Sequence, residues 1–268
     1  MRTFAAAAAL AAAAIAASAA PASAPRPLPD ADPAIWVIND HDTTIYLFGT
    51  FHALDGKSAW FNDEVLTAFA ASDELVLETV VPERGAAPWA APRSVQGSGR
   101  GSFLAATRLA ISAGRASGMQ VGFGAERVLL RAAEVSGKPV GGLESFTAQL
   151  GMMERMPAQP VPVGQAPSPA QAHQTMADLS LVMSEMQSAW NRGDWSLFAV
   201  MLANMQSNSP ESYDLMFAQR NASWASWITQ RLQQPGTVFV AVGTGHLVGR
   251  DSVQAKLALR GYRSSRIN

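Results

Sequence analysis

The sequence predicts an α/β fold of the α+β kind, with a central mixed sheet formed from N- and C-terminal strands and a largely helical middle region. Apolar, strand-like runs occur near both ends of the chain, at 45–48 and 238–242, and each is followed by Gly-Thr-x-His. The segments between them mostly carry apolar residues at helical spacing. Strands at both ends with helices between them imply that the terminal strands share one sheet.

The composition is that of an ordinary globular protein, and it excludes several kinds of site. The 268 residues carry a formal net charge of −1, which gives no electrostatic basis for binding nucleic acid. The chain contains no cysteine, so neither a disulfide framework nor a cysteine-ligated zinc site can form. Any metal must therefore be held by histidines and carboxylates.

Residues 1–24 have the features of a secretory signal peptide. Arg2 provides a short positive region, residues 4–17 are apolar and rich in alanine, and small-residue cleavage sites follow at 17–19 and 22–24. No other stretch is apolar for long enough to span a bilayer. We therefore expect a periplasmic or secreted protein with no stable membrane insertion after cleavage of the signal peptide.

A proline-rich linker at 25–33 leads into a single predicted catalytic domain at 34–268. The domain begins with a predicted β-hairpin, because two runs of β-branched and aromatic residues, at 35–38 and 45–48, flank the polar turn at 39–42. This hairpin supplies the N-terminal strands of the predicted sheet.

The elements after the hairpin are assigned from the spacing of apolar residues. Residues 60–71 have a helical pattern, and residues 74–80 are apolar on both faces, which is typical of a buried central strand. Residues 82–101 are rich in Gly, Pro, Ala and Ser and predict a surface loop. The remaining predictions are helices at 103–116, 125–135, 145–153, 170–190, 195–205, 210–233 and 251–259, strands at 118–121, 138–143 and 237–242, a proline-rich connector at 156–169 and a closing strand through Ile267.

The two Gly-Thr-x-His segments are the strongest functional signal. They place His52 and His246, two of only four histidines, directly after strand-like runs. Residues at the carboxyl ends of strands in an open α/β sheet line the crevice where ligands bind. The glycine three positions earlier lets the backbone turn sharply off each strand. We therefore expect the two imidazoles to lie close together in a candidate site.

Glu78 is the third candidate, because it lies in the predicted buried strand at 74–80. A buried carboxylate is costly unless it has a partner, and a structural salt bridge to an arginine is the alternative to a functional role. Together, His52, Glu78 and His246 form an N,N,O set suited to Zn, Mn, Co or Fe. Without a metal, the same groups suit general acid–base hydrolysis.

Two further residues have roles that the sequence leaves open. Glu144 follows the short predicted strand at 138–143 and is interpreted as a second base or ligand. Arg220 would either stabilise developing negative charge or neutralise one of the acids. The alternative for His52 and His246 is a structural role, with each imidazole hydrogen-bonded in the core below a helix.

Several segments resemble the TraB/PrgY/GumN family, which includes the Tiki membrane proteases that inactivate Wnt ligands. The pair of G-x-x-H motifs is the hallmark of this family, and the similar segments run in the same order from residue 34 to residue 267. These segments are Trp36, 46–52, 75–78, Leu143-Glu144 with Gln149, 190–194, Arg220-Asn221 with Trp224, 242–249 and Gly261-Tyr262.

The resemblance implies a hydrolase-like α/β catalytic domain, similar to erythromycin esterases and to the ChaN haem-binding proteins. For the Tiki branch, the implied activity is peptide cleavage that depends on manganese or cobalt. For the PrgY branch, it is reduction of the amount of a secreted pheromone peptide. The resemblance also implies which residues form the site, namely His52, Glu78 and His246, with Glu144, Arg220 and Asn221 close by.

We therefore expect an exported hydrolase, and more specifically a metal-dependent peptidase. It would act on a peptide or small-molecule substrate through His52, Glu78 and His246, with Mn, Co, Zn or Fe as a cofactor. Two alternatives stay open. One is a non-enzymatic periplasmic binding protein that sequesters a peptide, haem or a metal, and the other is a metal-independent esterase.

Overall fold

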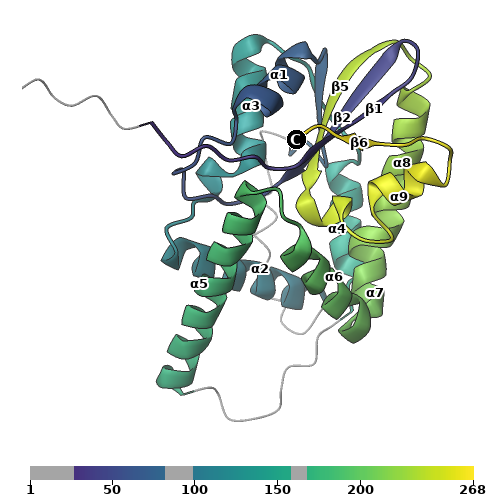
Figure 1. Ribbon diagram of the computed structural model, residues 1–268. Helices are drawn as coiled ribbons and strands as arrows, with labels where there is room; N and C mark the ends of the chain where they lie inside the picture. The colour runs from purple at the N-terminus through teal and green to yellow at the C-terminus, as the bar shows by residue number, and fades with distance from the viewer. Residues whose placement is uncertain (1–26, 82–98, 158–167) are drawn as a thin grey trace, which may run out of the picture.

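The computed structural model describes residues 27–81, 99–157 and 168–268 (Figure 1). The predicted signal peptide lies outside the described residues, as do residues 25–26 of the linker and most of the loop and the connector predicted at 82–101 and 156–169. None of the helices in the described ranges combines the length and apolar character needed to cross a bilayer.

The described strands form one mixed sheet of six strands in the order β4-β3-β5-β2-β1-β6. At its centre, β2 (Thr43–Thr50) pairs in parallel with β5 (Gly236–Gly243) along the whole length of both strands. The prediction that strands from the two ends of the chain share a sheet is therefore confirmed.

The outer strands complete the sheet on both sides of this central pair. The hairpin prediction is confirmed, because β1 (Ile35–Asn39) is antiparallel to β2. On the far edge, β6 (Ser265–Arg266) is antiparallel to β1. On the other side, β3 (Glu74–Leu77) is parallel to β5, and β4 (Val140–Gly142) is parallel to β3. The predicted α/β class with a mixed sheet is confirmed.

Helices cover both faces of the sheet, which explains why its central strands are apolar on both sides. Against one face pack α1 (Asp63–Ala71) and α3 (Ala125–Ser136), around an apolar cluster that includes Phe48 and Phe239. Against the other face pack α8 (Gln219–Arg231) and α9 (Val253–Ala258), around a second cluster of buried side chains that includes Leu47, Val76 and Val240.

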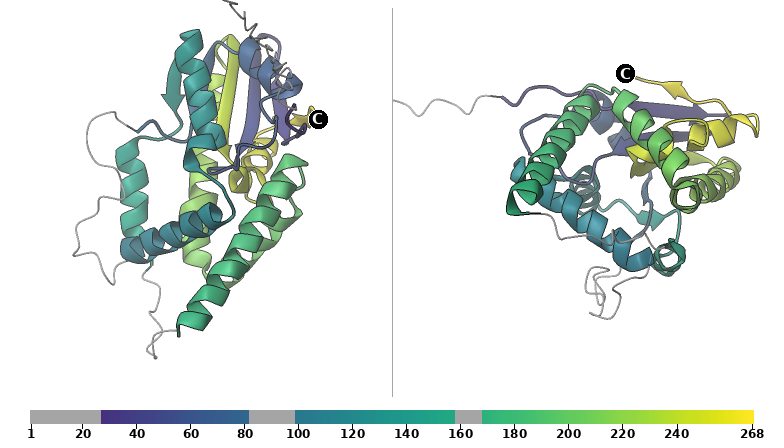
Figure 2. Two further views of the ribbon diagram at one scale, coloured as in Figure 1. Left: turned by 90° about the vertical axis from the view of Figure 1, so that its left-hand side faces the viewer. Right: turned by 90° about the horizontal axis from the view of Figure 1, so that it is seen from below.

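The helical middle region lies beyond the carboxyl ends of the central strands. Figures 1 and 2 show α2 (Gly99–Ala116), α5 (Pro169–Asn191) and α6 (Ser196–Asn208) in this position. The shorter α4 (Phe146–Arg155) packs against α2. It begins where predicted, because the Ser145 hydroxyl accepts the N–H of Ala148 at 3.1 Å and caps the helix.

The strand predicted at 74–80 ends early, because β3 stops at Leu77. The last register partner of β3 in β5 is Ala241. One residue further on, the side-chain carboxylate of Glu78, and not a backbone carbonyl, accepts the N–H of Gly243 at 2.8 Å. Glu78 therefore follows the strand instead of lying within it, which frees its side chain to turn toward the strand ends.

The segment predicted as a short strand at 118–121 does not join the sheet. Gln120 makes only an isolated bridge, to Leu54. Gly118 bends the chain on one side, with a φ of 84°, and a 3-10 turn at Val121–Phe123 begins on the other. These two bends leave too few extended residues for a strand.

The helix predicted at 210–233 is interrupted. It consists of α7 (Pro210–Tyr213), a π-helical turn (Asp214–Ala218) and α8. Single π-helical turns inside helices occur frequently at functional sites. Here the turn ends two residues before Arg220, one of the candidate site residues.

Substituting Trp190 tests a polar contact inside the larger apolar cluster. Trp190 is 1% exposed, and its indole N–H donates to the carbonyl oxygen of Gly49 at 2.8 Å. Trp190→Phe leaves this buried carbonyl without its donor, so we expect the free energy of unfolding to fall by about 1–3 kcal/mol. Urea denaturation measures the change, with Trp227→Phe as a control at a partly buried position. Equal stability of the two variants would contradict the assigned role of the hydrogen bond.

Candidate active site

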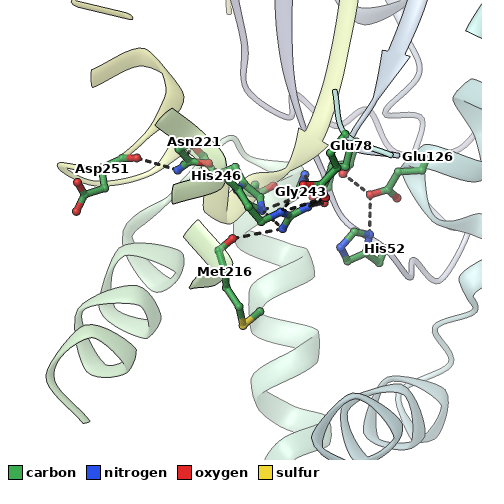
Figure 3. Close-up of polar contacts among 12 residues, drawn as sticks. His52, Glu78, Glu126, Met216, Asn221, Gly243, His246 and Asp251 are labelled. Atoms are coloured by element: carbon green, nitrogen blue, oxygen red, sulfur yellow. Dashed lines mark hydrogen bonds and ion pairs between the residues drawn. The ribbon is translucent and has the colours of Figure 1, made fainter. Parts of the chain in front are cut away.

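The carboxyl ends of β2, β3 and β5 bring the three main candidate residues to one edge of the sheet (Figure 3). His52 follows β2, and Glu78 follows β3. His246 lies in a 3-10 turn (Thr244–Leu247) that directly follows β5. Because the three strands are parallel neighbours, their ends meet at the same place.

The two Gly-Thr-x-His segments pack directly on each other. A Cβ atom on Gly49 would lie 3.1 Å from Oγ1 of Thr244, so glycine allows the close approach. The Thr244 hydroxyl in turn donates to the backbone carbonyl of Thr50 at 2.9 Å. The glycine and threonine of the motifs thus join the two strand ends, and the histidines project from this joint.

His52 has a partner that the sequence analysis did not identify. Its Nδ1 lies 2.6 Å from Oε1 of Glu126, in the first turn of α3. The Thr50 hydroxyl donates to the same carboxylate oxygen. The start of α3 can approach this closely because a Cβ on Gly124 would overlap the carbonyl oxygen of His52. The signal available in the sequence, an acid two residues after a glycine at a helix start, does not show which strand the helix meets.

The charge of Glu126 controls the protonation of His52. The negative charge stabilises the imidazolium and outweighs desolvation in the cleft, so the pKa of His52 rises from 6.5 to about 9. The side chain nevertheless keeps 72% of its surface exposed, and it lines a cavity. At neutral pH, His52 is therefore a charged proton donor that faces an open space.

Arg220 lies between the two candidate carboxylates and uses all five of its N–H groups. Its Nε–H and one Nη2–H donate to Glu144, at 3.1 and 2.6 Å, and the other Nη2–H donates to Glu78 at 2.7 Å. The two Nη1–H groups point to the carbonyl of Met216 at 3.3 Å and to Nε2 of His246 at 3.2 Å. Arg220 thus neutralises both acids and keeps no donor for a developing charge.

The hydrogen-bond partners of His246 define its tautomer. Asn221 donates through Nδ2 to the backbone carbonyl of Asp251 at 2.8 Å, so its Oδ1 must accept from Nδ1–H of His246, at 2.6 Å (Figure 3). The Nε2 atom then accepts from Arg220, which has no acceptor of its own. Burial, reinforced by the charge of Arg220, lowers the pKa of His246 to about 3. This imidazole is neutral.

Glu78 stays ionised although its side chain is only 15% exposed. Burial raises its pKa, but the charges of His246, which is protonated only at the acidic pH where Glu78 titrates, Arg220 and His52 outweigh burial and lower the pKa to about 2. Its Oε2 is held by Arg220, and its Oε1 accepts the N–H of Gly243. Oε1 is also one of the atoms around the space where a side chain on residue 243 would lie.

Both imidazoles have one feature of metal ligands. His52 is held through Nδ1 by Glu126, and His246 is held through Nδ1 by Asn221. Partners of this kind orient metal-ligating histidines and leave the Nε2 lone pair for the ion. The donor types therefore suit a divalent cation.

The position of Arg220 does not suit such an ion. Its guanidinium lies 3.2 Å from Nε2 of His246 and 2.7 Å from Glu78, where a metal shared by these residues would have to bind. The set of three ligands is therefore not formed in this arrangement. Within the described ranges, only one group brings three possible ligand atoms within 4.8 Å of one another, and it consists of the exposed residues Asp40, His41 and Asp42.

A cavity of about 480 Å³ opens beside His52 and Glu78. This volume is in the range of small-molecule and cofactor sites. Its walls come from the strand ends and from helices α2, α3, α4 and α5, and they are largely apolar. Leu77, Ala110, Ile111, Val121 and Met183 are among the apolar lining residues. The lining thus combines mostly apolar walls with the charged side chains of His52 and Glu78, which is the usual form of a substrate site.

Taken together, these features define an α/β domain with paired motifs and an adjoining pocket at the carboxyl ends of its parallel strands. The model of the TraB/PrgY/gumN family matches residues 34–98 and 99–266. The chain belongs to this family. No curated protein and no solved structure shows a match to the chain.

The pairing of His52 with Glu126 predicts a measurable change in titration. Glu126→Gln removes the negative charge that favours the imidazolium, so the pKa of His52 is expected to fall from about 9 toward its ordinary value of about 6.5. NMR titration of the His52 ring signals measures both values. Glu134→Gln, at an exposed position of the same helix, is the control and should leave the titration unchanged. A pKa near 6.5 in the unsubstituted protein would contradict the assigned pairing.

Proposed function

We propose that this protein is a hydrolase that cleaves an amide or ester bond of a peptide or small-molecule substrate. The observation that carries the proposal is that His52 and Glu78 face one space with opposite charges. The pKa of His52 is about 9 and that of Glu78 is about 2. Near neutral pH, one group holds a proton and the other is ionised. Titratable neighbours whose pKa values are pushed apart are typical of an acid–base pair.

The space between these groups lies over Gly243, which has no side chain to fill it. A Cβ atom at this position would lie 3.2 Å from Oε1 of Glu78 and 3.6 Å from Nε2 of His52. A water molecule in this hollow is within reach of both groups. Glycine at 243 therefore supports the proposal, because it keeps open the place where the nucleophile would be held.

In the proposed reaction, the carboxylate of Glu78 accepts a proton from this water while the water oxygen attacks the substrate carbonyl carbon. The C–N or C–O bond of the substrate then breaks, and His52 gives its Nε2 proton to the leaving group. Proton transfer from Glu78 to His52 restores both groups. The acid role is present at neutral pH and is lost as the pH rises through about 9, the pKa of His52.

The remaining candidate residues act as positioning residues in this proposal. Arg220 holds Oε2 of Glu78 so that Oε1 faces the hollow. Glu144 forms a second ion pair with the guanidinium of Arg220, and Nε2 of His246 accepts a hydrogen bond from it. Asn221 fixes the ring of His246. The network orients one carboxylate oxygen without adding a further group that touches the substrate.

Metal dependence is a second proposal, favoured by the outer partners on both imidazoles. It requires Arg220 to leave Glu78 and His246, after which His52, Glu78 and His246 would offer ligand atoms to Mn, Co, Zn or Fe. A bound ion of this kind would polarise the substrate carbonyl and lower the pKa of a water molecule. The metal-free reaction requires no such movement, and we place it first for this reason.

Glu78→Gln tests the proposed hydrolase once a substrate has been found by screening peptide and ester libraries. The variant cannot accept a proton from water, so we expect kcat/KM to fall by about 10²–10⁴-fold. Glu64→Gln, at an exposed position in the first turn of α1, is the matched control and should retain full activity. Circular dichroism checks that both variants are folded. Tight binding of a library compound with no turnover even by the unsubstituted protein would favour the non-enzymatic alternative.

Treatment with a chelator distinguishes the metal-free reaction from the metal-dependent one. The protein is purified without a histidine tag from the exported fraction, where N-terminal sequencing also tests cleavage after residue 19 or 24. We expect activity to survive treatment with EDTA. Loss of activity in EDTA, recovery with one ion, and bound metal that is absent from the His52→Ala/His246→Ala variant would instead establish the metal-dependent peptidase.

A further inference from the structure

We propose that the cavity binds the C-terminal end of a substrate, with an apolar side chain against its walls and a free carboxylate on Arg127. The substrate class would then be peptides or N-acyl amino acids that end in an apolar residue. This inference rests on the proposed function, since it assigns the substrate of the same cavity.

The guanidinium of Arg127 is the group that we assign to the substrate carboxylate. It lies in the first turn of α3, lines the cavity and is exposed to solvent. Within the part of the chain that the structure describes, no group accepts a hydrogen bond from its guanidinium or forms an ion pair with it. Arg131, one turn further along the helix, instead donates to the carbonyl of Gly122 at 2.8 Å. Arg127 is thus available for a bidentate contact with an anionic group.

Among the described residues, the charges around the cavity are balanced except for that of Arg127. The other charged side chains that line it already have counter-charges, because His52 is paired with Glu126 and Glu78 is paired with Arg220. Arg127 is the lining charge without a described partner. One guanidinium balances one negative charge, which matches a carboxylate better than a phosphate dianion in a largely apolar pocket.

The apolar walls of the cavity indicate the kind of side chain that the substrate carries. The space is lined by Ala110 and Ile111 of α2, by Val121 of the 3-10 turn before α3, and by Met183 of α5. Val121 is exposed although it is a large apolar residue. Burial of such surface by a ligand side chain is favourable, and a methionine adapts to side chains of different shape. The walls thus suit an aliphatic or aromatic group.

The three features match different parts of one ligand. The terminal carboxylate binds Arg127, and the terminal side chain fills the apolar space. Arg127 is the sequence neighbour of Glu126, which holds the proposed acid His52. A peptide bound in this way places its last amide bond in the same cavity as His52 and Glu78. The cavity would therefore favour removal of a C-terminal apolar residue.

Calorimetric titration tests this proposal without any need for turnover. The probes are N-acetyl-leucine, which has the carboxylate, and N-acetyl-leucine amide, which lacks it. The unsubstituted protein is expected to bind the acid more tightly than the amide. Arg127→Gln should weaken binding of the acid roughly tenfold to hundredfold and leave binding of the amide unchanged. Arg127→Lys, which keeps the charge but not the planar fork, should give an intermediate affinity.

Arg155→Gln is the matched control, because Arg155 is an exposed arginine in the last turn of α4 that does not line the cavity. It should leave both affinities unchanged. Equal affinity of the unsubstituted protein for acid and amide, or no effect of Arg127→Gln, would overturn the proposal.

The outcomes also separate this inference from the proposed hydrolysis. Selective acid binding that depends on Arg127, in a protein that hydrolyses no library member, would support the inference and overturn the hydrolase. Hydrolysis that depends on Glu78 but is equally fast for acids and C-terminal amides would support the hydrolase and overturn the inference.

Discussion

The ion pairs of Arg220 are the interaction on which the arrangement of the site depends. This arginine comes from α8 and joins Glu78 and Glu144, two carboxylates that are only 15% and 14% exposed. Without a cation between them, the two acids would repel each other and lose hydration without compensation. The guanidinium makes their burial possible and links a helix to the sheet. It also leaves one oxygen of Glu78 directed at the hollow over Gly243.

The paired motifs form one framework, but they give their histidines opposite environments. His52 projects into the cavity, and its acidic partner Glu126 keeps it charged. His246 is neutral chiefly because it is buried, and the charge of Arg220 reinforces this effect while Asn221 holds the ring in place. The difference comes from the helices that meet each strand end, since α3 supplies a carboxylate to one imidazole and α8 supplies an amide and a cation to the other. Similar motifs thus place their histidines in opposite protonation states.

Much of the fold could be predicted because its signals are local. The hairpin, the sheet shared by the terminal strands and the main helices follow from apolar spacing. The strand ends identify His52 and His246 as neighbours, and burial in an adjacent predicted strand identifies Glu78. The role of Glu126 could not be predicted, because it depends on where the start of α3 meets β2. The position of Arg220 between potential metal ligands depends on tertiary packing in the same way. The signal peptide, the bound metal and the substrate stay predictions.

The parallel pairing of β2 with β5 has a consequence for how the protein acquires its site. The hydrogen bond that joins the two motifs, from Thr244 to Thr50, connects residues 194 positions apart in the sequence. Contacts between such distant residues form slowly, because the loss of chain entropy precedes the gain from pairing. A growing chain therefore has no complete site until its last long strand has been synthesised. Because of the strand order, a chain that ends before β5 cannot form the candidate site.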